Sequence, residues 1–330
     1  TLRRKRRSIS NATKDLCQPR SDARLDYSSV MKTLAVAASA SLLLLTACST
    51  ENPEADLVSS WEVSFDHPTG IRGVSPELAE IDGVTTLMVT SLDPDKYWTT
   101  HDGISFEKTS IQMPPGADYT VIEQPDGSWR LYFADFLGDF SNAPPGPDDL
   151  KGVLTTTTED FTSYGPVEET GVEQLRPGRA WGVPDTVQAP DGSVFMYWVD
   201  EVEGERWEVV RLATSIDGVN FDVQEDPVIF GGYVDPFVLQ AEEGAWVMLL
   251  STTPHPSELP QKLHLARSDD GISWEVDPTP LFEDEQWNYL DPTAIPQGDS
   301  WLIVASRASL EEAQNPENAE LIAGTLTKLP

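Results

Sequence analysis

One pattern of residues recurs between Ala117 and Ala305, and it restricts the chain to a repeat architecture. Each copy contains an acidic residue, an apolar run, a turn near a glycine and a second apolar run. The copies lie at residues 118–133, 185–198, 235–250 and 291–304, with a weaker one at residues 77–89. Their acidic residues are separated by 41, 67, 50 and 56 positions. Repetition at this period is typical of proteins built from one repeated supersecondary unit.

A second element of the repeat is an Asp-Gly turn that ends on an aromatic residue. It occurs at residues 101–106, 215–221 and 268–274, with a degenerate copy at residues 158–161. Glycine accepts a positive φ and Asp hydrogen-bonds its own backbone, so the pair is suited to a tight turn. We interpret these motifs as structural, and we expect Phe106, Phe221 and Trp274 to pack between sheets.

The apolar runs predict β-strands rather than helices. Runs such as residues 194–198 are rich in β-branched and aromatic residues and lie between turn signals. From residue 61 onward, helical periodicity is nearly absent, and only residues 310–319 have a short helical pattern. Four-stranded sheets repeated about an axis form a β-propeller. The sequence therefore predicts an all-β fold, a five-bladed β-propeller over residues 61–330.

In a propeller, the residues that open the innermost strands converge near the axis at one face. Here they are Glu77, Asp118, Asp185, Asp235 and Asp291. Crowded carboxylates raise some pKa values and leave other groups ionised. Such a ring can carry out acid–base chemistry or hold a hard cation such as calcium. The alternative is that each Asp only caps a turn, as expected where a proline follows it.

The N-terminal region has the features of an export signal. Residues 31–47 contain one lysine, an apolar stretch and then small residues, which is the pattern of a secretory signal. Residues 45–48 resemble the lipobox of bacterial lipoproteins, and this resemblance implies that Cys48 becomes the lipidated first residue. We therefore predict export to the bacterial cell envelope, with membrane attachment through a lipid anchor only. Residues 48–60 are the predicted tether, and residues 1–30 are predicted to be an upstream, non-native extension.

The predicted mature chain is strongly acidic. Residues 1–47 contain nine of the 22 Lys and Arg and three of the 55 Asp and Glu, which leaves a formal net charge of −39 from Cys48 onward. Such a surface repels nucleic acid and anionic lipid, so we expect neither as a partner. It suits neutral sugars, calcium or a saline habitat. Of the two cysteines, Cys17 lies in the predicted non-native extension and Cys48 is predicted to be lipidated, so no disulfide is expected.

The acidic residues that open the innermost strands, the hairpin glycines and the Asp-Gly turns resemble those of five-bladed propeller glycosidases, particularly glycoside hydrolase family 43. This resemblance covers residues 65–329. This resemblance implies three catalytic carboxyl groups, a base, an orienting Asp and a general acid. They would be Glu77 or Asp82, Asp118 and Asp185. Two departures stand out, because the first-blade Asp is missing from residues 74–78 and the third-blade acid is Asp rather than Glu.

We predict a glycoside hydrolase-like protein, a monomer, that acts on neutral glycans through these carboxylates. Aromatic faces can stack on sugar rings. The predicted substrate-binding residues are Tyr233, Tyr289, Trp181, Arg179, Asp235 and Asp291. The alternative is an inert surface propeller that binds carbohydrate or protein. A sialidase-like enzyme is a lesser alternative, because its Asp-box spacing and blade number differ from the pattern seen here.

Overall fold

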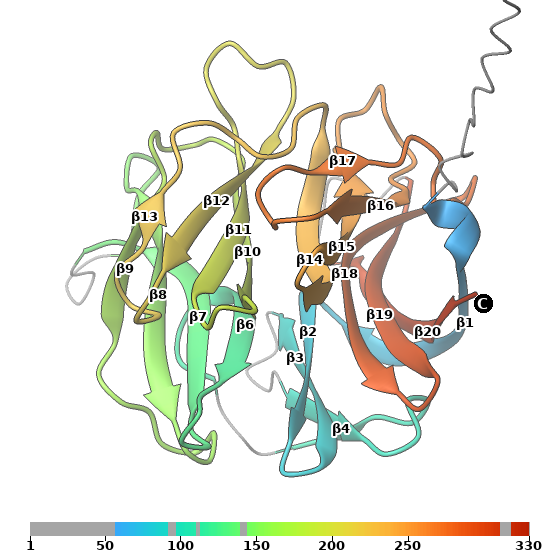
Figure 1. Cartoon of the computed structure of the whole chain (residues 1–330), viewed down its shortest axis with the longest axis horizontal. Coiled ribbons are helices and arrows are strands. Elements are labelled where there is room, and N and C mark those ends of the chain that lie inside the picture. Colours follow the sequence, from blue (N-terminus) through green and yellow to red (C-terminus); the bar gives the residue numbers. More distant parts are fainter. Residues whose placement is uncertain (1–56, 92–96, 110–112, 139–143, 311–317, 330) are drawn as a thin grey trace, which may run out of the picture. The chain divides into compact units, whose positions relative to one another are not determined.

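The computed structural model describes residues 57–91, 97–109, 113–138, 144–310 and 318–329 (Figure 1). These residues form strands β1 to β20 and one short 3-10 helix, η1 (Val58–Ser60), with no α-helix among them. Within these ranges, no helix has the length and apolar character needed to cross a membrane. The predicted signal at residues 31–47 and most of the predicted helical pattern at residues 310–319 lie outside the described residues.

The strands form five antiparallel sheets of four strands each, which confirms the predicted five-bladed propeller. Blade 1 contains β2 (Val74–Ile81), β3 (Val84–Thr90), β4 (Tyr97–Thr100) and β5 (Glu107–Lys108). Blade 2 contains β6 (Ala117–Glu123), β7 (Trp129–Phe136), β8 (Lys151–Thr158) and β9 (Glu168–Glu173). Blade 3 contains β10 (Trp181–Gln188), β11 (Val194–Asp200), β12 (Val209–Ser215) and β13 (Asp222–Val223). Blade 4 contains β14 (Tyr233–Glu242), β15 (Ala245–Thr252), β16 (Leu263–Ser268) and β17 (Glu275–Val276).

Blade 5 joins the two ends of the propeller chain. It contains β18 (Trp287–Gln297), β19 (Ser300–Ser309) and β20 (Glu320–Lys328), and its outermost strand is β1 (Trp61–Arg72). β1 pairs antiparallel with β20 from Trp61 opposite Lys328 to Arg72 opposite Glu320. The two backbones approach so closely that a Cβ on Gly324 would lie 1.8 Å from the Ser64 carbonyl oxygen. This closure was not part of the sequence prediction.

The innermost strands β2, β6, β10, β14 and β18 face a common centre (Figure 1). Each of them contacts the innermost strand of the next blade, and β18 contacts β2 to complete the circle. Each innermost strand also has one edge that no further strand of its own sheet covers. The N–H groups on that edge need other hydrogen-bond partners if they are buried.

The hydrophobic core is divided into layers between neighbouring blades. Trp198 packs in the layer between blades 2 and 3, whereas the adjacent Tyr197 packs in the layer between blades 3 and 4. Strand side chains point alternately to opposite faces, so a central strand buried on both faces must be apolar throughout. This explains why the run at residues 194–199 is continuous, with every side chain in it at most 9 % exposed.

The Asp-Gly turns have the structural role predicted from sequence. The Gly218 carbonyl accepts a hydrogen bond of 2.9 Å from the Tyr132 hydroxyl of blade 2, and Gly271 accepts one of 2.5 Å from Tyr197 of blade 3. The aromatic residues that end these turns also pack on the preceding blade. Phe221 lies edge-on against Tyr132 at 5.9 Å, and Trp274 against Tyr197 at 5.8 Å.

We expect Gly218→Ala to destabilise the propeller because the residue has φ +71° and an added Cβ would lie 2.9 Å from the Tyr132 hydroxyl. Gly127→Ala is the matched control, since Gly127 has φ +84° with no atom within 4 Å of an added Cβ. The left-handed backbone costs either variant about 1 kcal/mol. Gly218→Ala should cost about 1 to 2 kcal/mol more, since it disturbs a buried hydrogen bond. Urea unfolding measures both losses, and equal losses would contradict the proposed contact.

Candidate functional site

A β-bulge occurs near the start of each innermost strand. The register with the neighbouring strand shifts between Val74 and Glu77 in blade 1, and at the corresponding point in every other blade. One residue of each bulge has a left-handed backbone, with φ between 48° and 54°. These residues are Ser75, Asp118, Val183, Asp235 and Asp291. A positive φ is unusual for any residue other than glycine, most of all for a β-branched one such as Val183. Its recurrence shows that the five positions are equivalent.

This equivalence corrects the alignment of the repeats expected from the sequence. Asp118, Asp235 and Asp291 occupy the bulge position, but Glu77 and Asp185 lie two residues after it. In blades 1 and 3 the bulge position is occupied by Ser75 and Val183 instead. All five acidic residues nevertheless line one small axial cavity, so their predicted convergence is correct.

The axial carboxylates connect the blades in a closed circle. Three of them accept from the bulge of the next blade, Asp118 from Val183 N at 3.1 Å, Asp235 from Asp291 N at 3.3 Å and Asp291 from Ser75 N at 3.0 Å. The other two accept from a residue beyond the next bulge, Glu77 from Val121 N at 3.3 Å and Asp185 from Val238 N at 2.8 Å. Each of the five junctions between blades therefore has one carboxylate that accepts a main-chain N–H.

Burial controls the ionisation of these groups. Glu77, Asp185, Asp235 and Asp291 are each at most 8 % exposed. Burial raises the pKa of Asp185 to about 7 and that of Asp235 to about 6. Burial, together with the charge of Asp185, raises the pKa of Glu77 well above its usual range. Burial and the charge of Asp235 do the same for Asp291. Desolvation disfavours the ionised form, so these carboxyl groups hold protons more tightly than surface ones.

The axial cavity is too small for a sugar. Its volume is about 20 Å³, and prolines and aromatic residues that follow the bulges line it together with the carboxyl groups. A cavity of this size holds about one water molecule. No group of three or more His, Cys, Asp or Glu within the described ranges is arranged to hold a metal ion. Calcium binding stays a prediction.

The predicted substrate-binding aromatic residues do not gather at the axis. Trp181 is 8 % exposed and packs in the layer between blades 2 and 3, and Tyr289 is 3 % exposed and contacts the rings of Phe65 and Phe282. Tyr233 is partly exposed and lies edge-on to His264 at 5.2 Å. Tyr233 lines a cavity of about 440 Å³.

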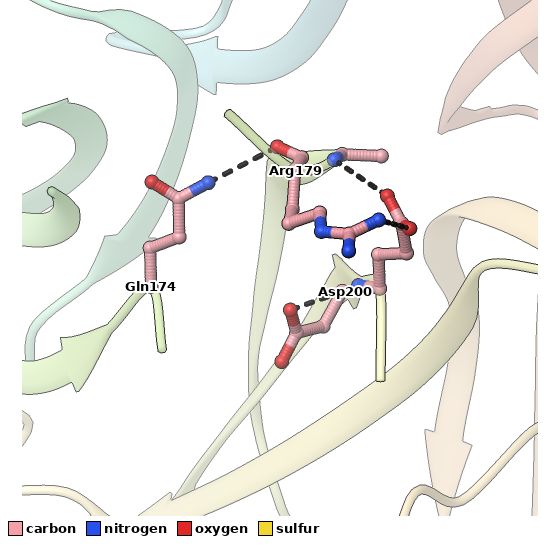
Figure 2. Close-up of polar contacts among 5 residues, drawn as sticks. Gln174, Arg179 and Asp200 are labelled. Atoms are coloured by element: carbon pink, nitrogen blue, oxygen red, sulfur yellow. Dashed lines mark hydrogen bonds and ion pairs between the residues drawn. The ribbon is translucent and has the colours of Figure 1, made fainter. Parts of the chain in front are cut away.

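Arg179 belongs to a polar network at the edge of blade 3 (Figure 2). Its guanidinium forms an ion pair with Glu201, and its carbonyl accepts a hydrogen bond of 3.0 Å from the Gln174 side chain. Glu201 also accepts from Ala180 N at 3.4 Å, and its own N–H donates to Asp200 at 2.8 Å. The network fixes the loop before β10, and it occupies the guanidinium group that was predicted to bind substrate.

Two larger cavities lie away from the axis. One of about 790 Å³ lies at the hairpin between β6 and β7, where Ser128, Arg130 and Thr157 line it. The other, about 440 Å³, lies at the starts of β14 and β16, where Trp207, Tyr233 and His264 line it. Sequence reasoning missed Trp207 and His264. The signal that could have located them is the pair Gly231 and Gly232 before Tyr233, since adjacent glycines allow a close backbone approach.

The comparisons with known proteins identify the fold. No protein-family model matches the chain, and no curated protein has a matching sequence. An endo-arabinase from Bacteroides thetaiotaomicron has a similar structure, with a TM-score of 0.56, 12% sequence identity, and coverage of 81% of this chain and 98% of that one. An N-acetylgalactosamine deacetylase from F. plautii, in complex with blood group B trisaccharide, has a TM-score of 0.55, 11% identity, and coverage of 81% and 95%.

A third similar structure is an alpha-L-arabinanase from Cellvibrio cellulosa complexed with arabinohexaose. Its TM-score is 0.51, with 12% identity and coverage of 77% of this chain and 91% of that one. At this identity the likeness shows the fold alone. The chain therefore has the five-bladed propeller fold of these structures, and the fold agrees with the sequence prediction.

We expect Asp185→Asn to stabilise the protein at high pH relative to the unmodified chain. Because the pKa of Asp185 is raised to about 7, the folded protein binds a proton that the unfolded chain releases near about pH 4. The stability of the unmodified chain therefore falls as pH rises through this window. Between about pH 5 and about pH 8, the variant should gain about 2 kcal/mol relative to the unmodified chain in urea unfolding.

Asp126→Asn is the control for this experiment. Asp126 is exposed, and hydrogen bonds from Ser128 lower its pKa. Its contribution to stability is therefore present across the whole window, so its difference from the unmodified chain should not change with pH. A change of the same size in both variants would show that Asp185 is not the group responsible.

Proposed function

We propose that this protein is an exported, lipid-anchored propeller that binds neutral carbohydrate, and that its axial carboxylates stabilise the ring rather than cleave glycosidic bonds. The observation that carries the proposal is the axis itself. Each of the five carboxylates accepts a main-chain N–H from the next blade, and about 20 Å³ of space remains between them. Hydrolysis requires two carboxyl groups with a glycosidic bond between them, and this space admits no sugar ring.

The choice of carbohydrate rests on the fold and the charge. Structures with the same fold include arabinanases, one of them complexed with arabinohexaose, and a deacetylase in complex with a trisaccharide. The chain from Cys48 onward has a formal net charge of −39, with 13 basic and 52 acidic residues. Such a charge repels anionic polymers, including nucleic acid and polyuronates, and leaves neutral glycans as the favoured class.

Hydrolysis is the second candidate, and one pair of residues favours it. Burial raises the pKa of Glu77, and the charge of Asp185 raises it further, so the two carboxyl groups interact. The pKa of Asp185, about 7, is suited to a general acid at neutral pH. This candidate requires the axis to open around the substrate.

The sialidase alternative has less support. It needs several arginines to clamp one carboxylate. Here Arg211 pairs with Asp200 at 3.4 Å, Arg267 pairs with Glu275 at 2.8 Å and Arg307 pairs with Glu320. The three arginines lie in three different blades, and each is paired within its own sheet.

Hydrolysis and binding are tested together on the full chain with arabinan, xylan and galactan and the oligosaccharides derived from them. We expect binding without turnover, and Glu77→Gln and Asp185→Asn should change the dissociation constant by less than about twofold. Asp126→Asn is the matched control, and circular dichroism verifies that each variant is folded. Turnover by the unmodified chain that falls at least about 100-fold in both axial variants would establish the hydrolase instead.

The proposed anchor is tested by Cys48→Ser in a bacterial host. The resemblance of residues 45–48 to a lipobox supports acylation of this cysteine. The strongly acidic surface of the protein is not expected to bind the membrane by itself. We therefore expect the unmodified chain in the membrane fraction and the variant in the soluble envelope fraction. Ser49→Ala is the control and should leave the distribution unchanged. Equal distribution of Cys48→Ser and the unmodified chain would contradict lipid anchoring.

A further inference from the structure

The cavity of about 440 Å³ over blade 4 has the composition of a ligand site, and we call it the blade-4 pocket. Its volume lies within the range of small-molecule sites in proteins. Side chains from the starts of β14 and β16 and from the loops after β11 and β15 line it. They include Trp207, Tyr233, Thr253, Glu258, Lys262 and His264. The pocket is separate from the axial carboxylates, none of which lines it.

Two aromatic rings in the pocket wall are held in place by their neighbours. Trp207 lies edge-on to His255 at 4.6 Å, and the Arg206 guanidinium lies over its ring at 4.2 Å from the centroid, which leaves the other ring face for a ligand. A Cβ on Gly232 would lie 3.2 Å from the Trp207 Cβ and 3.0 Å from Thr253 Cγ2. Tyr233 lies edge-on to His264 at 5.2 Å. Rings that are fixed before binding lose little conformational entropy when a ligand stacks on them.

His264 supplies a fixed hydrogen-bond acceptor. Its Nδ1 lies 3.0 Å from the Asp277 carbonyl oxygen. A carbonyl only accepts, so Nδ1 carries the proton and Nε2 of the neutral ring presents a lone pair. Burial lowers the pKa of His264, which keeps the ring neutral. His264 is only 5 % exposed, and its Nε2 makes no hydrogen bond with another described residue.

The remaining polar groups are one lysine, three glutamates and a threonine, and most of them already have a partner. Lys262 Nζ pairs with Glu283 at 2.7 Å, and Glu258 accepts from the Ser257 hydroxyl at 3.1 Å. Thr253 is 2 % exposed, donates to Glu208 at 2.7 Å and already accepts from His255 N at 3.3 Å, so its hydroxyl is satisfied within the protein. A pocket with a paired lysine, carboxylates and a neutral acceptor favours an uncharged ligand with hydroxyl donors over an anion.

We propose that the blade-4 pocket binds a terminal, neutral sugar residue of a glycan, with Trp207 and Tyr233 stacking on its apolar face and His264 Nε2 accepting from a hydroxyl. This inference rests on the proposed carbohydrate-binding function and assigns a site to it. The cavity of about 790 Å³ near β6 and β7 is the competing location. Its aromatic residue is the partly exposed Tyr164, whose hydroxyl already lies 3.4 Å from the Tyr97 hydroxyl.

The test is titration of the full chain with arabinohexaose, xylohexaose and cellohexaose by calorimetry. We expect Trp207→Ala to weaken binding at least about 10-fold. His264→Phe keeps a ring against Tyr233 but removes the acceptor, and should weaken binding about 3- to 10-fold. His101→Phe, in an exposed turn, and Tyr164→Ala, in the competing cavity, are controls that should stay within about twofold. Thermal unfolding verifies that all four variants are folded, and Tyr233→Ala replaces any pocket variant that is not.

The outcomes separate this inference from the proposed function. Binding by the unmodified chain that is lost in the pocket variants supports the site. Binding that the pocket variants retain, or that Tyr164→Ala alone removes, overturns the site but leaves carbohydrate binding standing. Absence of binding to any of the three oligosaccharides by the unmodified chain overturns the site and removes the support for the proposed function.

Discussion

The hydrogen bonds between axial carboxylates and the main chain of the next blade are the interaction on which the ring depends. In every blade, the innermost strand is at the edge of its sheet, so one side of it has no partner strand. The bulge near its start interrupts pairing with the strand's own sheet, so N–H groups there need other acceptors. Buried N–H groups require acceptors. Five carboxylates supply them, one at each junction, and the raised pKa of the buried groups is the consequence of taking them out of water.

The sequence was sufficient for the fold because two signals agreed. Acidic residues before apolar runs marked the innermost strands, and Asp-Gly turns marked the outer ones, so blade number and strand type followed. The alignment of blades 1 and 3 could not be obtained this way. Glu77 and Asp185 are acidic like their counterparts but lie two positions after the bulge residue. In a bulge an extra residue shifts the register, and Ser75 and Val183 carry no residue-type signal for it.

The candidate site differs from the sequence expectation in a related way. The convergence of the five acidic residues follows from the propeller topology. The space between them depends on how closely the bulges of the five blades approach one another, which the residue types alone do not specify. The same holds for Trp181 and Tyr289, whose burial is set by neighbouring blades. Trp207, in the loop after β11, and His264, in β16, line the same pocket because blades 3 and 4 pack together, a long-range arrangement without a local pattern. In our proposal, recognition takes place at the blade-4 pocket, whereas the axial carboxylates hold the blades together.

The pairing of β1 with β20 also determines when the ring can form. β1 is the first strand of the propeller to be synthesised, and its only partner strand is the last. Blades 1 to 4 contain only strands that are consecutive in the chain, so they can assemble while synthesis continues. The last blade cannot, and until residues 320–328 emerge β1 has an unpaired edge of the kind that promotes aggregation. Completion of this fold therefore depends on the pairing of two strands that lie at opposite ends of the propeller sequence.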